Sequence, residues 1–180
     1  MNIFLLVASI LLWVGSIWCL YGRLIVAPAL SLVALFLLSL MSDNGVPLLP
    51  INGVMLSSWF ALSLLVAVIC YLQPEQIRRQ TRGMLYIIVG GFTGMALGML
   101  GYSVTSSVSL RYSCMALSIA AGIIFGFLLY TYTPQGRQVK PGSGFFVKYL
   151  LAKGFPTLVT LMQMGIALVI AIAMANVNAL

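Results

Sequence analysis

The sequence predicts an all-α membrane protein: a bundle of six transmembrane helices that forms a single domain over residues 1–180, with one short amphipathic helix at the interface. The first observation is composition, because 62% of the residues are apolar and only 6% are charged. In soluble domains about 45–50% of the residues are apolar and about 25% are charged. The second is spacing, because the charged residues separate six uncharged runs of 18 to 22 residues. About 20 helical residues cross a hydrocarbon core of about 30 Å, so each run fits one crossing.

The six predicted helices cover approximately residues 3–21, 24–41, 54–72, 84–102, 112–131 and 156–177. Lipid offers the backbone no hydrogen-bond partners, which favours helices over isolated strands. A β-barrel would need an alternation of polar and apolar residues that the stretch 64–69 lacks. Only Gly22 and Arg23 separate the first two runs, so we expect a tight turn there. The first run lacks the basic start and the cleavage site of a signal peptide, and we expect it to be retained.

The basic residues predict the orientation of the helices. The connections after the first, third and fifth runs hold eight Lys and Arg residues, and the other side holds only Arg111. The positive-inside rule places the richer side in the cytoplasm, so both termini are expected outside it. We expect a multi-pass protein of the cell membrane, specifically of a bacterial inner membrane, and we expect the lipid bilayer to be its partner. The net charge of +7 suits contact with an anionic membrane leaflet, and we do not expect nucleic acid to be a binding partner.

A basic connection follows the third run, over residues 73–83. Arg78 and Arg82 are four residues apart and share a helix face, with Arg79 projecting differently. We interpret these three arginines as topology and lipid-headgroup residues. An anion site for a phosphate-bearing substrate is the alternative.

The longest connection, residues 132–155, ends in a stretch that is both aromatic and basic. Phe145, Phe146 and Tyr149 are interspersed with Lys148 and Lys153. The pattern predicts a short amphipathic helix that lies in the interface with both lysines toward lipid headgroups. Docking to a partner protein is the alternative.

Glycine repeats are the most specific pattern in the chain. Two neighbouring runs carry small residues every three or four positions, and small residues let helix backbones approach closely. The last run adds Ala167, Ala171 and Ala175 at the same spacing. We expect packing within one protomer; a stripe that faces a second protomer, and a pore or lipid groove, are the alternatives. The predicted helix-packing residues are Gly90, Gly94, Gly98, Gly101, Ser118, Gly122 and Gly126.

The order of these features resembles a family of small uncharacterised glycine-rich bacterial polytopic membrane proteins. The shared features are a paired hairpin with Pro28, the Arg82-Gly83 approach to a glycine-rich helix, a second such helix and a final apolar helix. The chain departs from that family at Ala29, where the family has glycine after the proline, and in lacking an acid near the end of the second glycine-rich helix. The resemblance implies a polytopic membrane fold and no activity.

Few residues could carry chemistry. The chain has no histidine and two acids, so we expect no catalytic residues, no cofactor and no metal site, and we do not expect an enzyme. Its three cysteines are isolated within apolar runs, where cysteine behaves as a small hydrophobe. Gln163 is the most costly polar side chain to bury, and we expect it to form an interhelical hydrogen bond. Substrate binding by Gln163 is the alternative.

Two hypotheses of function remain. The first is a structural or accessory subunit that acts through helix packing, as a homo-oligomer or in a larger membrane complex. The absence of catalytic groups and the glycine repeats favour it. The second is a small uncoupled transporter or channel for a neutral or lipid-like solute. Six helices would allow an inverted repeat of three and three, but the loops of the two halves do not match.

Overall fold

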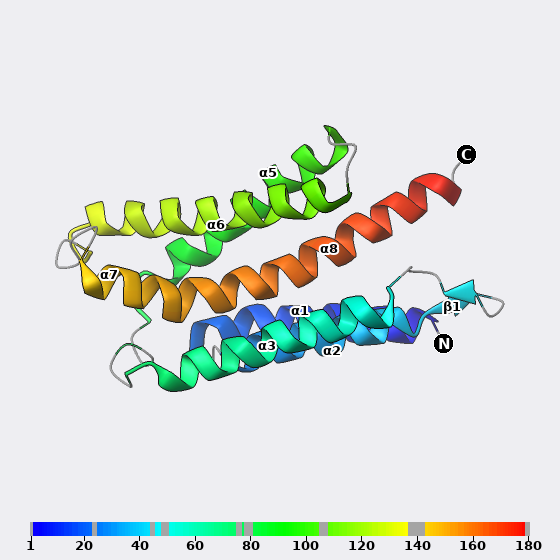
Figure 1. Ribbon diagram of the computed structural model, residues 1–180, viewed down its shortest axis with the longest axis horizontal. Coiled ribbons are helices and arrows are strands. Elements are labelled where there is room, and N and C mark those ends of the chain that lie inside the picture. Colours follow the sequence, from blue (N-terminus) through cyan, green and yellow to red (C-terminus); the bar gives the residue numbers. More distant parts are fainter. Residues whose placement is uncertain are drawn as a thin grey trace.

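The structure, a computed structural model, is helical apart from one small hairpin (Figure 1). It describes residues 2–22, 25–43, 46–47, 51–74, 77, 81–104, 108–136 and 143–178. Strands β1 (Ser42–Asp43) and β2 (Val46–Pro47) pair antiparallel, with Ser42 opposite Pro47. The helices are α1 (Asn2–Gly22), α2 (Val26–Ser39), α3 (Gly53–Leu72), α5 (Met84–Val104), α6 (Val108–Tyr132), α7 (Gly144–Tyr149), the π-helix η1 (Leu150–Gly154) and α8 (Phe155–Asn178).

Each of the six uncharged runs contains one of the helices α1, α2, α3, α5, α6 and α8, and the ends of these differ from the predicted ones by at most four residues. The last helix is preceded without a break by α7 and η1, so its helical stretch begins earlier than predicted, at Gly144. Within the described residues, four helical stretches are long and apolar enough to cross a membrane: Ile3–Gly22, Gly53–Leu72, Leu110–Tyr132 and Gly144–Ile172. The part of α5 over Met84–Leu100 is apolar but shorter. Helix α2 has only 14 residues, a length of about 21 Å, which is less than the hydrocarbon core of about 30 Å.

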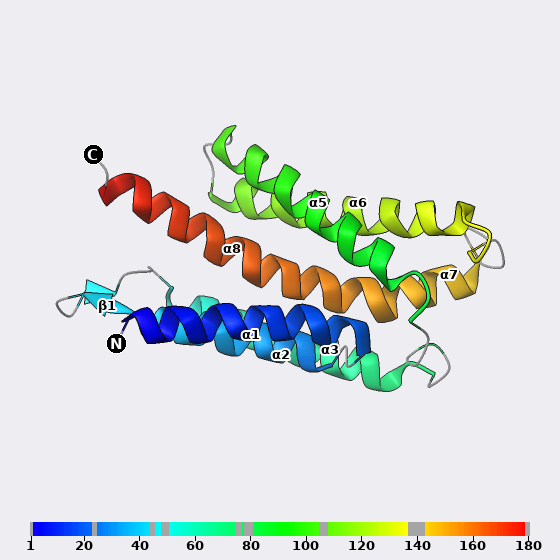
Figure 2. The ribbon, with the colours of Figure 1, turned by 180° about the vertical axis from the view of Figure 1, so that it is seen from behind.

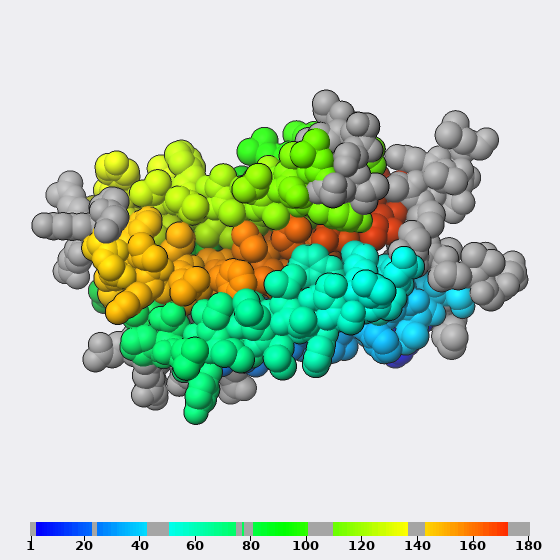
Figure 3. Space-filling model, in the orientation of Figure 1, coloured from blue at the N-terminus to red at the C-terminus, as the bar shows by residue number. Residues whose placement is uncertain are grey.

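Helix α8 is the central element of the bundle. It runs between the α5–α6 pair on one side and the group of α1, α2 and α3 on the other (Figures 1 and 2). In its most apolar stretch 72% of the residues are buried, against 17% in α1 and 11% in α3. Figure 3 shows the part of α8 that stays at the surface, a strip between α6 and α3. The core of the molecule therefore lies around α8.

The ends of the helices sort to the two ends of the molecule. One end of the molecule holds the start of α1, the end of α8 and the β1–β2 hairpin (Figures 1 and 2). The opposite end holds the end of α1, the start of α5 and α7. The connection between α1 and α2 is short, and the buried Ser16 hydroxyl of α1 donates a hydrogen bond to the Ala27 carbonyl of α2 over 2.8 Å. These two helices thus form the tight hairpin that the sequence predicts.

Helices α7, η1 and α8 form one continuous helix rather than two. The backbone of Tyr149, Leu150 and Phe155 at the junctions is right-handed helical, and the Leu150 amide still donates to the Phe146 carbonyl. The Ser143 hydroxyl caps the start of α7 by accepting a hydrogen bond from the Phe146 amide over 3.2 Å. The predicted separate amphipathic helix in the interface is therefore not confirmed, because this stretch is the beginning of the last helix.

The predicted close packing of the glycine stripe is confirmed, and its partner is α6 of the same chain. A methyl group added at Gly90 would lie 3.1 Å from the Gly126 Cα and still closer to the Gly122 carbonyl oxygen. A methyl group at Gly94 would lie 2.9 Å from the Ile119 Cα. In the opposite direction, one at Gly122 would lie 3.0 Å from the Gly94 Cα. Both backbones therefore touch along a stretch where only glycine fits.

Substitution of these glycines tests the backbone contact. We expect Gly94→Ala and Gly122→Ala each to lower the free energy of unfolding by about 1–3 kcal/mol, because the added methyl group would force two backbones apart. The measurement is thermal unfolding in detergent, followed by fluorescence-detected size-exclusion chromatography.

Gly15→Ala is the matched control. Gly15 also lies inside a helix, but a methyl group there would meet nothing within 4 Å. Alanine has the higher helix propensity by about 1 kcal/mol, so we expect this variant to be as stable as the wild type or more stable. Equal behaviour of all three variants would contradict the close contact between α5 and α6.

Candidate functional site

The predicted helix-packing residues lie in the interface between α5 and α6. Ser118 belongs to it as well, since its Cβ would lie 3.4 Å from a methyl group added at Gly98, and Gly126 faces the backbone of Tyr86. Gly101 lies in α5, but its contacts fall outside the described ones. The side of the stripe formed by Gly90, Gly94 and Gly98 is covered by α6 of the same chain. It is therefore no free surface for a second protomer.

The predicted basic residues are found in three situations. Arg78 and Arg79 lie outside the described residues. Arg82 is exposed in the turn before α5, and Lys148 is exposed on α7. Lys153 is only 1% exposed.

The burial of Lys153 corrects the prediction that its ammonium group faces lipid headgroups. The residue lies in η1, where the last helix enters the bundle and is packed on both sides. On one side the Cys70 thiol of α3 lies 3.9 Å from the carbonyl oxygen of Ala152, the residue before Lys153. On the other side Ile123 of α6 packs on Gly154. The prediction was wrong because it treated residues 145–153 as a surface helix with one covered face.

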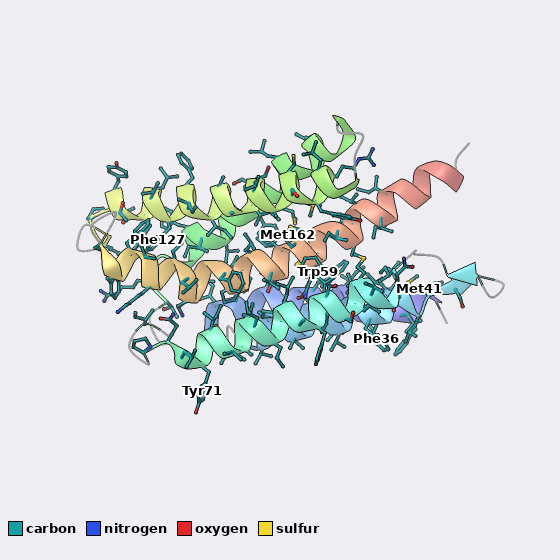
Figure 4. The ribbon with its side chains drawn as sticks, in the orientation of Figure 1. Phe36, Met41, Trp59, Tyr71, Phe127 and Met162 are labelled. Carbon is teal, nitrogen blue, oxygen red and sulfur yellow. The ribbon has the colours of Figure 1, made fainter. Side chains whose placement is uncertain are left out.

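An aromatic cluster joins α7 to α6 and was not predicted. The Phe127 ring of α6 lies 4.8 Å from the Tyr149 ring and 4.9 Å from the Phe146 ring, measured between centroids. Figure 4 shows Phe127 in the space between α6 and α7. The signal in the sequence is a pair of aromatic residues three apart in each helix, Phe127 with Tyr130 and Phe146 with Tyr149, since such pairs share a helix face.

The same cluster fixes the turn that precedes α5. The Tyr149 hydroxyl donates a hydrogen bond to the Arg82 carbonyl over 2.5 Å. The next residue, Gly83, has φ +84°, and a side chain there would collide with the Tyr130 ring. Glycine is thus required at Gly83 by both its backbone conformation and its neighbour. The exposed Arg82 side chain therefore starts from a backbone that is held in place.

A polar junction lies in the middle of the bundle, where the sequence predicts an interhelical hydrogen bond from Gln163. That prediction is confirmed. The Gln163 side-chain oxygen accepts a hydrogen bond from the Ser31 hydroxyl of α2, and its nitrogen donates to the Ser63 hydroxyl of α3 over 3.1 Å. Ser31 and Gln163 are fully buried. One side chain of α8 thus connects two other helices, and its hydrogen bonds are used within the chain rather than for a substrate.

A groove lies between α1 and the beginning of α5, and we call it the α1–α5 groove. Its volume is about 970 Å³, near the top of the range of about 300–1,000 Å³ for small-molecule sites. Thr81 and Tyr21 lie at the end of the groove where α1 ends and α5 begins. The groove is open to the side, because two of its residues, Trp18 and Leu85, are 83% and 55% exposed. The apolar walls are formed by Val14, Ile17, Trp18, Leu85 and Ile88.

A second groove is smaller and lies between α6 and the α7–η1–α8 helix. Its volume is about 230 Å³, and its walls include Ile123, Leu151 and Leu158. Its lining is almost wholly apolar, so it offers nothing that could orient a polar ligand. The α1–α5 groove, which combines apolar walls with a polar end, is the better candidate for a binding site.

The polar junction yields a prediction that a double-mutant cycle can check. We expect Gln163→Leu and Ser63→Ala to show a coupling of about 0.6 kcal/mol in the free energy of unfolding, the average for interhelical hydrogen bonds between membrane helices. Thr93→Val is the control, because the Thr93 hydroxyl bonds to the Gly90 carbonyl of its own helix over 2.8 Å. Its effect should add to that of Gln163→Leu without coupling. Additive effects of Gln163→Leu and Ser63→Ala would contradict the junction.

Comparison with known proteins finds no relative of this chain. No protein-family model matches the chain, and no curated protein or solved structure does. The resemblance to glycine-rich bacterial polytopic proteins therefore stays a prediction, and the function has to be argued from the chain itself.

Proposed function

We propose that this chain is a multi-pass integral membrane protein that holds a lipid-like molecule in the α1–α5 groove. The first support is the surface of the bundle. Large apolar side chains are exposed on helices throughout it, among them Phe4 of α1, Leu72 of α3 and Leu117 of α6. Apolar surface of this extent is unfavourable in water and favourable in lipid. The four long apolar helical stretches are consistent with the same environment.

We further propose that both termini lie outside the cytoplasm of a bacterial cell. The support is the eight-to-one distribution of Lys and Arg between the two sets of connections. Exposed Arg82 and Lys148 lie at the end of the molecule opposite to the start of α1 and the end of α8. This end would face the anionic cytoplasmic leaflet.

Single cysteines test this orientation. In a background with Cys19→Ser, Cys70→Ala and Cys114→Ala, we expect Ser42→Cys to react with a membrane-impermeant maleimide in intact cells. Lys148→Cys should react only after the cells are opened. Both positions are exposed to the surroundings in the fold. Labelling of Lys148→Cys in intact cells would refute the proposed orientation.

The observation that carries the lipid-binding proposal is the shape of the α1–α5 groove. Its walls are apolar along α1 and α5, and its polar residues gather at one end. An amphiphile with an apolar tail and a polar head has the same distribution of polarity. The groove is open to the side, so a lipid could enter from the bilayer without crossing water. Holding such a molecule, or passing it between leaflets without coupling to an ion, is the activity that this geometry supports best.

Filling the groove tests the proposal. Leu85 lines it and is 55% exposed, so Leu85→Trp adds volume in the groove without entering the core. We expect this variant to retain at least one lipid fewer than the wild type after purification in a neutral detergent, as counted by native mass spectrometry. Leu97→Trp is the control, because Leu97 lies on the same helix, is 64% exposed and does not line the groove. Equal lipid retention by the two variants would argue against a site in the groove.

The accessory-subunit hypothesis has lost one of the two features that favoured it. The glycine stripe that could have faced a partner packs on α6 of the same chain. Recovery of a stoichiometric second protein with the detergent-solubilised chain would restore that hypothesis. It stays a prediction beside the proposed lipid site.

A further inference from the structure

We infer that the α1–α5 groove selects a phospholipid with a net negative charge, and that Arg82 contacts its phosphate group. This inference rests on the proposed function, since it assumes a lipid in the groove. It adds the chemical class of the lipid and the residue that recognises it.

The first step is the direction of the groove. From Val14 on α1 the lining passes to Tyr21 and Gly22, the last residues of that helix. On the other wall it passes from Ile88 back through Leu85 to Thr81, just before α5. The apolar part therefore lies along the helices, and the polar part lies at their ends. A lipid tail fits along the first part, and its headgroup comes to lie near Thr81 and Tyr21.

The second step is the charge at this polar end. Arg82 follows the groove residue Thr81 directly, so the Cα atoms of these two residues are about 3.8 Å apart. Its side chain is exposed and long enough to reach a headgroup. Of the two acids in the chain, Asp43 lies in β1 at the other end of the molecule, and Glu75, seven residues before Arg82, lies outside the described residues. The exposed Arg82 side chain is thus a positive charge beside the polar end of the groove, and it complements an anion.

The third step is the fixed position of Arg82. The Tyr149 hydroxyl holds its carbonyl, and the left-handed Gly83 beside the Tyr130 ring fixes the backbone that follows. A guanidinium group on a fixed backbone loses less freedom when it binds, and its planar donors match a phosphate. Arg82 is therefore better suited to selecting a bound headgroup than a lysine on a loose segment.

A competition between two lipids tests the inference. The purified full chain is mixed in neutral detergent with equimolar phosphatidylglycerol and phosphatidylcholine that carry identical acyl chains, and retained lipids are counted by native mass spectrometry. We expect the wild type to prefer phosphatidylglycerol by about fivefold, the factor that corresponds to one Lys or Arg near an anionic lipid surface. Arg82→Gln should bring this ratio close to one while leaving the total number of retained lipids unchanged.

Lys148→Gln is the matched control. It removes the same charge from another exposed position outside the groove, so a preference that depends only on net charge would fall equally in both variants. We expect Lys148→Gln to keep the wild-type ratio, and Arg82→Lys, which keeps the charge but not the planar donors, to restore part of it. Equal losses in Arg82→Gln and Lys148→Gln would overturn the role of Arg82.

The remaining outcomes separate this inference from the proposed function. Equal retention of the two lipids by the wild type, together with loss of both in Leu85→Trp, would overturn the charge selection and leave the lipid site standing. No lipid retained by the wild type would overturn both. A doubled mass that Leu85→Trp dissociates would show that a second copy of the chain occupies the groove, and would likewise overturn both.

Discussion

The two-sided packing of α8 is the constraint on which the rest of the structure depends. One of its faces carries Leu161 and Gly165, which pack on Gly91 of α5 and on Met115 of α6. The opposite face carries Val159, Gln163 and Ala167, four residues apart, which meet α2 and α3. In the proposed bilayer no hydrophobic effect would drive helices together, so close contact and hydrogen bonds would have to hold them. Helix α8 supplies both, and the two groups of helices meet through it.

The two groups of helices that flank α8 are held together by different physical means. In the α5–α6 pair the two backbones touch through glycines, and van der Waals contact between close atoms stabilises the pair. On the other side, polar side chains connect the helices: Ser16 joins α1 to α2, and Gln163 joins α2 and α3 to α8. Figure 4 shows Trp59 of α3 on the side that faces α8, whereas Tyr71 of the same helix projects away from the bundle. Backbone contact demands an exact spacing of small residues, whereas hydrogen bonds demand only that their partners lie at the same depth.

The sequence is informative about where helices begin and end, and much less about which of their faces touch. Charged residues separate the apolar runs, and most helix ends lie near them. Arg111 within α6, and Lys148 and Lys153 within the continuous last helix, are the exceptions. The glycine stripe and Gln163 also stand out, since each is an exception in an apolar run. The central place of α8 does not stand out, because leucine and valine serve equally well against lipid and against another helix. The α1–α5 groove arises from the relative placement of two helices that are far apart in the sequence, and no local pattern encodes it.

Lys153 and Ala167 show the same limit at the level of single residues. Lys153 has the residue type of an interfacial anchor, yet the helix that carries it continues into the bundle and buries it. Ala167 continues a small-residue repeat of the kind that marks α5 and α6, but it packs with Leu35 and Leu38 of α2 instead of joining that pair. In both cases the neighbour that decides the role of the residue comes from another part of the chain.

The central place of α8 has a consequence for how the protein is made. A chain is synthesised from its N-terminus, so in the proposed membrane α1 to α6 would enter the bilayer before the helix around which they are arranged. The hairpins α1–α2 and α5–α6 join helices that are neighbours in the sequence, and each can pair as soon as it has emerged. In the proposed bilayer, lipid tails would fill the space between these early units until α8 arrives. The last helix would then replace lipid in the middle of the bundle.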